Sequence, residues 1–275
     1  MFYVYLVLSA VLIPVSDIFF DVLRESYSWW LVPLLFVGFF IGLVILHLAI
    51  FALSVAFVNV NSPAERGAKY YRFAVNITIP LLLKLCRVKV NASGVEKLPE
   101  NKRFLLVCNH QHDFDPIMIM SVLPNAELGF IGKKEIYKTM PFIAKIMHKL
   151  YCLPIDRENN REAAKTIISA SRLLKEDKAS VGLFPEGYTS KTCELLPLRN
   201  GAFKIAYKAH APIAVCVINN TRAIPHRVII KKTEIEFRVL DVINPEQFEG
   251  LHTNGLGEIV YNEMNNALKD IRKER

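Results

Sequence analysis

Three local patterns that together indicate the fold follow one another in the stretch Phe104-Leu-Leu-Val-Cys-Asn-His-Gln-His-Asp-Phe-Asp-Pro116. Residues 104–108 are wholly apolar, which is typical of a strand buried on both faces. Polar residues follow at once over 109–115, and Pro116 is a residue favoured in the first turn of a helix. The stretch therefore predicts a strand, a tight polar turn and a helix.

The same alternation continues along the chain. Further apolar strand candidates lie at 128–131, 152–155, 181–184, 213–218, 228–230 and 235–239. Helical patterns lie at 116–123, 140–150, 161–174, 202–209 and 257–272. Short apolar strands separated by helices predict an α/β fold with a mostly parallel sheet flanked by helices. Ligands bind such sheets at the carboxyl ends of the strands, so polar residues at those ends are candidate site residues.

The region before this domain is apolar and almost free of charge. Residues 26–64 contain no Asp, Glu, Lys or Arg, whereas a bilayer core needs only about 20 helical residues. We therefore predict a transmembrane helix at about 29–58, and a second, shorter helix at 1–20 that could cross or lie on the bilayer. Residues 1–63 would form an N-terminal membrane anchor, and residues 64–275 one domain.

Charge is distributed unevenly between these two parts. The chain has a formal net charge of +8, but residues 1–63 hold one basic and three acidic residues, so the remainder is strongly basic. Basic residues crowd the segment after the predicted span: Arg66, Lys69, Arg72, Lys84, Arg87 and Lys89. The positive-inside rule predicts a domain on the cytoplasmic face of the membrane, next to anionic lipid. No nucleic-acid partner is expected, because no recognition motif accompanies the charge.

The first polar cluster suggests acid–base chemistry. His110 follows its strand directly, and Asp115 lies five residues on, at the start of the helix. A tight turn can bring the two together, so that the carboxylate keeps one imidazole nitrogen protonated and leaves the other as a base. The alternative is that the two residues merely cap a loop and a helix. With His112 they also form a pattern that would suit a metallohydrolase, although no other histidine stands in a ligand-like context.

A second cluster could bind an anion. Arg157 follows the strand candidate at 152–155, and its planar guanidinium offers donors that suit a phosphate. Lys133 and Lys134 could assist it, or could be ordinary solvated lysines.

The third cluster is Phe184-Pro-Glu-Gly-Tyr-Thr-Ser190. Its strand breaks at Pro185, and Gly187 permits a positive φ or the close approach of a ligand, so Glu186 is held at a fixed turn. Glu186 could orient a substrate group or pair with Arg157, or it could be a plain turn residue.

Taken in order, these residues resemble the glycerolipid acyltransferase family, and most closely its 1-acylglycerol-3-phosphate acyltransferases. Four motifs over about residues 85–245 carry the resemblance: Asn109-His110 with Asp115, Ile155-Asp156-Arg157, Phe184 to Gly187 with Ser190, and Ala211 to Val215. The third departs from the family pattern, because Tyr188 and Thr189 replace Thr and Arg. That departure removes one positive charge and leaves the acceptor open.

The resemblance implies transfer of an acyl chain from acyl-CoA or acyl carrier protein to the free sn-2 hydroxyl of 1-acylglycerol-3-phosphate, giving phosphatidate. His110 and Asp115 would be catalytic, without a metal or a cofactor. Substrate would be bound by Arg157, Glu186, Gly187, Lys133, Lys134 and Asn109. The expected partners are the lipid bilayer, a lysophospholipid and the acyl donor. Another lysophospholipid acceptor, a membrane-anchored metallohydrolase and a lipid-binding protein with a degenerate site are the alternatives.

Overall fold

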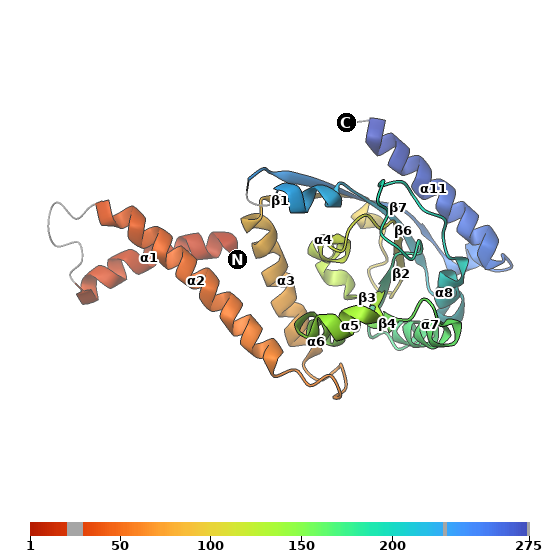
Figure 1. The fold of residues 1–275 in the computed structure, drawn as a ribbon, viewed down its shortest axis with the longest axis horizontal. Coiled ribbons are helices and arrows are strands. Elements are labelled where there is room, and N and C mark those ends of the chain that lie inside the picture. The colour runs from red at the N-terminus through yellow and green to blue at the C-terminus, as the bar shows by residue number, and fades with distance from the viewer. Residues whose placement is uncertain (21–29, 228–229, 274–275) are drawn as a thin grey trace.

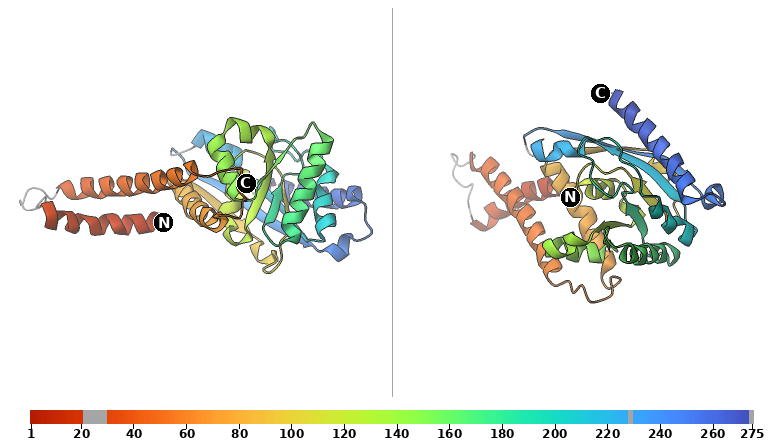
Figure 2. Two further views of the ribbon diagram at one scale, coloured as in Figure 1. Left: turned by 90° about the horizontal axis from the view of Figure 1, so that it is seen from below. Right: turned by 45° about the vertical axis from the view of Figure 1, so that its right-hand side comes forward.

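The computed structural model describes residues 1–20, 30–227 and 230–273, and in it two N-terminal helices project from a body built on one sheet (Figure 1). These helices are α1 (Phe2–Phe20) and α2 (Leu31–Ala56), which lie side by side (Figure 2). Of the described helices, α2 is long and apolar enough to cross a membrane, and α1 is a shorter apolar helix. The predicted span at 29–58 thus contains one continuous helix, with Trp29 outside the described residues.

Helix α3 (Ala68–Leu85) joins the helix pair to the body. Leu81 of α3 packs in one cluster with Tyr5 of α1 and Val44 of α2. His47 Nε2 of α2 also lies 2.9 Å from the Thr78 hydroxyl of α3. The carboxyl half of α2 therefore packs on the domain instead of standing apart from it.

Arg72 of α3 makes hydrogen bonds within the domain, although its place in the sequence suggests a charge that faces the membrane surface. Its guanidinium donates from Nη1 to the Leu128 carbonyl at 3.1 Å and from Nη2 to the Leu150 carbonyl at 3.3 Å. Burial lowers the pKa of Arg72. The other five basic residues of that segment are exposed, so they remain available to anionic lipid.

Seven strands form one sheet among the described residues, in the order β1-β7-β6-β2-β5-β3-β4. They are β1 (Val88–Ser93), β2 (Leu105–Cys108), β3 (Leu128–Lys133), β4 (Leu153–Ile155), β5 (Ser180–Leu183), β6 (Ile213–Asn219) and β7 (Thr233–Ile243). All neighbouring strands are parallel except β6 and β7. The predicted mostly parallel sheet is confirmed, β1 is an additional strand, and the strand predicted at 228–230 falls on residues 228–229, outside the described residues.

Helices cover both faces of this sheet, as Figure 1 shows. The helices that follow α3 are α4 (Asp115–Val122), α5 (Lys134–Thr139), α6 (Pro141–Lys149), α7 (Asn160–Lys175), α8 (Lys204–Ala209), α9 (Ile224–Arg227), α10 (Pro245–Phe248) and α11 (Thr253–Lys273). Leu105 and Val107 of β2 pack in the core with α7, α8 and α11. Leu106 and Cys108 face the other core, with α3 and α4. Because alternate side chains enter opposite cores, the whole strand is apolar.

The direction of the strands places the candidate residues. Strands β6, β2, β5, β3 and β4 are neighbours and parallel, so their carboxyl ends share one edge of the sheet. His110 follows β2, Glu186 follows the adjacent β5, and Arg157 follows β4 at the end of the row. The three polar clusters therefore meet at one edge, as expected for a parallel sheet.

Candidate active site

The turn between β2 and α4 brings His110 and Asp115 together. His110 Nδ1 lies 2.8 Å from Asp115 Oδ2, and the same oxygen accepts the backbone N–H of Gln111 at 2.7 Å and of His112 at 2.9 Å. Asp115 is completely buried. An oxygen with three donors around it cannot rotate away, so it fixes the imidazole and keeps the proton on Nδ1.

The imidazole plane is also fixed by aromatic stacking. The His110 ring lies 4.1 Å from the Phe184 ring, centroid to centroid, with an interplanar angle of 12°. Phe184 in turn stacks on Phe130, with 5.6 Å between the ring centroids. His110 Nε2 makes no hydrogen bond in the described ranges, and it is not among their fully buried unpaired atoms. The nitrogen that would act as a base is therefore open to a ligand.

Glu186 holds the backbone of His110 and does not pair with Arg157. Its Oε1 accepts the His110 N–H at 2.5 Å, and its Oε2 accepts the Leu196 N–H at 2.7 Å. Burial, with a smaller contribution from nearby Asp115, raises the pKa of Glu186 to about 7. The proposed ion pair with Arg157 is thus replaced by two backbone hydrogen bonds, which make Glu186 a positioning residue.

The third cluster contacts His110 at a second point. The Ser190 N–H donates to the His110 carbonyl at 2.7 Å. The turn after β5 therefore binds both the N–H and the carbonyl of the histidine, which explains why the two motifs occur together.

Asn109 has a part in aligning the strands. Its Oδ1 accepts the Ile218 N–H at 2.8 Å, and its Nδ2 donates to the Ile218 carbonyl at 2.9 Å. Asn109 is 2% exposed. The side chain thus ties the end of β2 to β6, and both of its polar atoms bond to the backbone of Ile218.

Gly187 adopts the positive φ that its place in the turn suggests, at +80°. A Cβ atom at this position would lie 2.7 Å from Nε of Arg199. The close approach that the glycine permits is therefore that of an arginine side chain.

Arg157 and Arg199 flank one aromatic ring. The Cζ atoms of Arg157 and Arg199 lie 5.5 Å and 5.3 Å from the centroid of Tyr188. Arg199 Nη2 also lies 3.4 Å from the Tyr188 hydroxyl. Burial, and then the charge of Arg199, lower the pKa of Arg157. Arg199 is not among the residues that the sequence patterns indicate, because it lies on a loop and not at the end of a predicted strand.

The two lysines lie at the same edge but contact other groups. Lys133 of β3 pairs with Ile155 of β4, and Ile155 lies two residues before Arg157 in the sequence. Lys134 Nζ lies 3.5 Å from Asp156 Oδ2, in an exposed ion pair. Lys133 is thus placed near the carboxyl end of β4, whereas Lys134 already has a partner.

The His112 side chain contacts Phe114. Its Nδ1 accepts the Phe114 N–H at 3.3 Å, and its ring lies 4.8 Å from the Phe114 ring. No group of three or more His, Cys, Asp or Glu side chains is placed to hold a metal ion in the described part of the chain.

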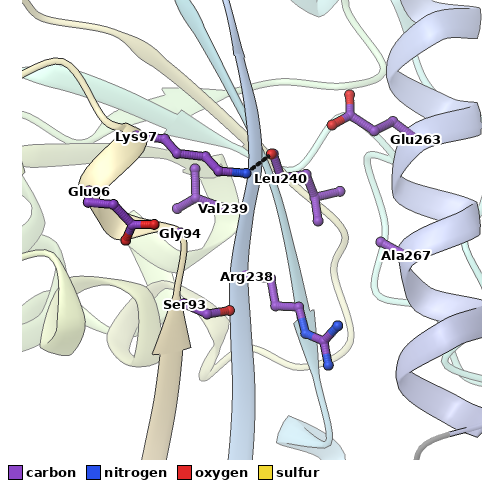
Figure 3. A pocket seen from close by; sticks show the side chains of 9 residues that line it. All are labelled: Ser93, Gly94, Glu96, Lys97, Arg238, Val239, Leu240, Glu263 and Ala267. Carbon is purple, nitrogen blue, oxygen red and sulfur yellow. Dashed lines mark hydrogen bonds between the residues drawn. The ribbon is translucent and has the colours of Figure 1, made fainter.

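A hollow of about 390 Å³ lies away from these residues, between β7, α11 and the short helix η2 (Val95–Lys97) (Figure 3). Lys97 points into it and donates to the Leu240 carbonyl at 2.6 Å. Arg238 and Glu263 line it as well, but no predicted site residue does. The candidate active site is therefore the edge of the sheet that carries His110, and not this hollow.

Comparisons with known proteins agree with this site. The acyltransferase family model matches residues 89–219. The chain is 28% identical over 218 residues to a probable 1-acyl-sn-glycerol-3-phosphate acyltransferase of Mycoplasma pneumoniae, covering 74% of this chain and 79% of that protein. It is 26% identical over 205 residues to the 1-acyl-sn-glycerol-3-phosphate acyltransferase of Bacillus subtilis, covering 74% of this chain and 98% of that protein.

A solved structure shares the fold over nearly the whole chain. The crystal structure of the 1-acyl-sn-glycerophosphate acyltransferase from Thermotoga maritima superposes with a TM-score of 0.63 at 17% identity. The match covers 99% of this chain and 98% of that one, so it includes the N-terminal helices as well as the sheet.

Proposed function

We propose that this chain, of which residues 89–219 match the acyltransferase family model, transfers an acyl chain from an acyl thioester to the sn-2 hydroxyl of 1-acylglycerol-3-phosphate, giving phosphatidate for phospholipid synthesis. The observation that carries the proposal is the His110–Asp115 pair. One nitrogen of the imidazole is held by a buried carboxylate at 2.8 Å, and the other is open. This arrangement suits removal of a proton from an alcohol.

The reaction needs no covalent intermediate with the enzyme. His110 Nε2 takes the proton of the acceptor hydroxyl while its oxygen attacks the thioester carbonyl. The imidazolium that forms is stabilised by Asp115. When the tetrahedral intermediate collapses, the C–S bond breaks, and the imidazolium protonates the departing thiolate. The products are an ester and a free thiol, and His110 is neutral again.

Acid–base catalysis of this kind contributes about 10²- to 10⁴-fold to the rate, so positioning and oxyanion stabilisation must supply the rest. Glu186 and Ser190 support positioning, since they bind the backbone of His110 on both sides. The stack on Phe184 limits rotation of the ring. Arg157, with Lys133 as a second cation, would attract the phosphate of the acceptor.

The helix pair suits a substrate that resides in a bilayer. Helix α2 is apolar enough to enter the membrane, and exposed basic residues follow it. We place the domain on the cytoplasmic face, where acyl-CoA and acyl carrier protein occur and where anionic lipid attracts basic residues.

The test presents the purified full chain, in nanodiscs, with a panel of lysophospholipids and with both acyl-CoA and acyl carrier protein donors. Products are read by mass spectrometry. We expect phosphatidate from 1-acylglycerol-3-phosphate, and absence of phosphatidate with either donor would refute the proposal. Preference for another lysophospholipid would reassign the acceptor.

A variant pair tests the catalytic role of His110. His110→Ala should lose at least about 100-fold in kcat. His210→Asn is the matched control, because His210 is exposed and has the positive φ of 50° that asparagine tolerates. Loss of activity on chelation with recovery on adding zinc would instead favour the metallohydrolase alternative.

A further inference from the structure

We propose that Arg199, together with Tyr188 and Arg157, forms a clamp for the phosphate of the acceptor, so that Arg199 sets the preference for a phosphate-bearing lysolipid. These three residues are called the Tyr188 clamp below. The inference rests on the proposed function and adds to it a specificity-determining residue outside the four motifs.

The guanidinium groups of Arg157 and Arg199 lie beside the same aromatic ring in this clamp. Both guanidinium carbons lie within 5.5 Å of the Tyr188 centroid. Glu135 is near enough to affect the pKa of Arg157, yet neither arginine forms an ion pair with an acidic side chain of the described ranges. Like charges held side by side repel, so the arrangement gains most when a ligand with two negative charges enters.

Arg157 also has a donor in need of an acceptor. Its Nη1 is buried and has no hydrogen-bond partner among the described residues. A buried N–H without a partner is costly, and a bound oxyanion would remove that cost. The exposed side of the clamp is accessible, because Tyr188 is 46% exposed.

The turn after β5 links the clamp to the backbone of His110. Tyr188 is two residues from Glu186 and two from Ser190, and both of those contact the backbone of His110. Two residues span at most about 7 Å, so the Cα atom of Tyr188 lies within that distance of the Cα atoms of Glu186 and Ser190. The proposed acceptor carries its phosphate and its reactive hydroxyl on neighbouring carbons, so a phosphate held beside this turn would bring the hydroxyl to the edge of the sheet that carries His110.

Arg199 is held in place by the turn. Its backbone N–H donates to the Pro185 carbonyl at 2.8 Å, and its side chain lies over Gly187. Thr189, next to Tyr188, has no charge. Arg199, which lies ten residues after Thr189, thus provides a positive charge beside Tyr188.

The experiment compares Arg199→Gln with Lys191→Gln in nanodiscs. Lys191 is an exposed cation of the same loop, so its variant makes the same change in charge away from the ring. We expect Arg199→Gln to raise KM for 1-acylglycerol-3-phosphate at least about tenfold, with kcat within about twofold, and to leave the KM for monoacylglycerol unchanged. In the Arg199→Gln background, Thr189→Arg should lower KM again.

Three outcomes would overturn the clamp. The first is an unchanged KM of Arg199→Gln for 1-acylglycerol-3-phosphate, and the second is an equal rise of that KM in Lys191→Gln. The third is an equal rise of the KM of Arg199→Gln for monoacylglycerol. A binding readout separates this inference from the proposed reaction. Glycerol 3-phosphate should raise the melting temperature of the wild type more than that of Arg199→Gln. If that difference persists in a wild type that forms no phosphatidate, the clamp stands and the reaction fails. If it is absent, the clamp fails whatever the activity.

Discussion

One carboxylate oxygen organises the site at the residue scale. Asp115 Oδ2 meets the His110 ring and two backbone N–H groups, all within 2.9 Å. The backbone of the turn thus holds the carboxylate in place, and the carboxylate in turn fixes the orientation of the imidazole. Neighbouring Asp113 is exposed and takes no part in this arrangement.

The first prediction concerns Asp115→Asn. An amide presents a donor where the carboxylate accepts, and it stabilises an imidazolium poorly, so kcat should fall by about 10²- to 10⁴-fold with a smaller change in KM. Asp113→Asn makes the same substitution two residues away and should keep full activity. Steady-state kinetics on both variants decide the matter; equal losses would show that Asp115 has no special role.

The second prediction concerns the stability of the fold as a function of pH. Burial raises the pKa of Glu186 from 4.5 to about 7, so between these values the folded chain binds a proton that the unfolded chain does not. The free energy of unfolding should therefore fall as pH rises from about 4.5 to about 7, by up to about 1.4 kcal/mol per pH unit, and then level off.

Glu186→Gln cannot titrate, so it should lack this component. Melting temperatures of wild type and variant, measured from pH 4.5 to pH 8, should differ in slope below pH 7 and run parallel above it. Parallel curves over the whole range would contradict the raised pKa.

At the scale of elements, three strands position the stacked rings of Phe130, Phe184 and His110. Phe130 of β3 stacks on Phe184 after β5, and Phe184 stacks on His110 after β2. Gly182 of β5 makes room for this stack, because a Cβ atom there would lie 2.4 Å from the Phe130 ring. Phe130 is buried and cannot easily move aside.

The third prediction is therefore that Gly182→Ala destabilises the fold by about 1–3 kcal/mol, as overpacking does, and also lowers kcat through the displaced stack. Gly201→Ala is the control, since its Cβ would meet no atom within 4 Å. Chemical denaturation and kinetics should show a loss in the first variant alone. An unaltered Gly182→Ala protein would mean that the stack adapts freely.

At the scale of the whole molecule, the helix pair and the sheet are joined through α3. That helix packs on α1 and α2 through Leu81 and on the sheet region through Arg72. A membrane that receives α2 therefore sets the height and orientation of the domain, and with them the position of the edge that carries His110.

The fourth prediction concerns the orientation of the chain. With the domain on the cytoplasmic face, a fluorescent protein fused to the carboxyl terminus should fluoresce in a bacterial host. Alkaline phosphatase at the same place should be at least about tenfold less active than when exported, because its disulfides do not form in the cytoplasm. The opposite result would reverse the predicted topology.

Features that depend on neighbours along the chain could be predicted from the amino-acid sequence. Apolar runs between helical patterns indicate the α/β class, the uncharged run indicates the helix that α2 contains, and the spacing of His110 and Asp115 indicates their contact. These inferences succeed because secondary structure and tight turns follow from local periodicity and from proline and glycine.

Contacts between segments that are distant in the sequence became known from the tertiary structure. It placed β1 parallel to β7 and bonded both carboxylate oxygens of Glu186 to backbone N–H groups. It also directed the Arg72 guanidinium of α3 to the Leu128 carbonyl of β3 and brought Arg199 onto Tyr188. Such contacts depend on strand order and on which loop crosses which edge. Local spacing does not encode that order, because the packing of the whole sheet fixes it.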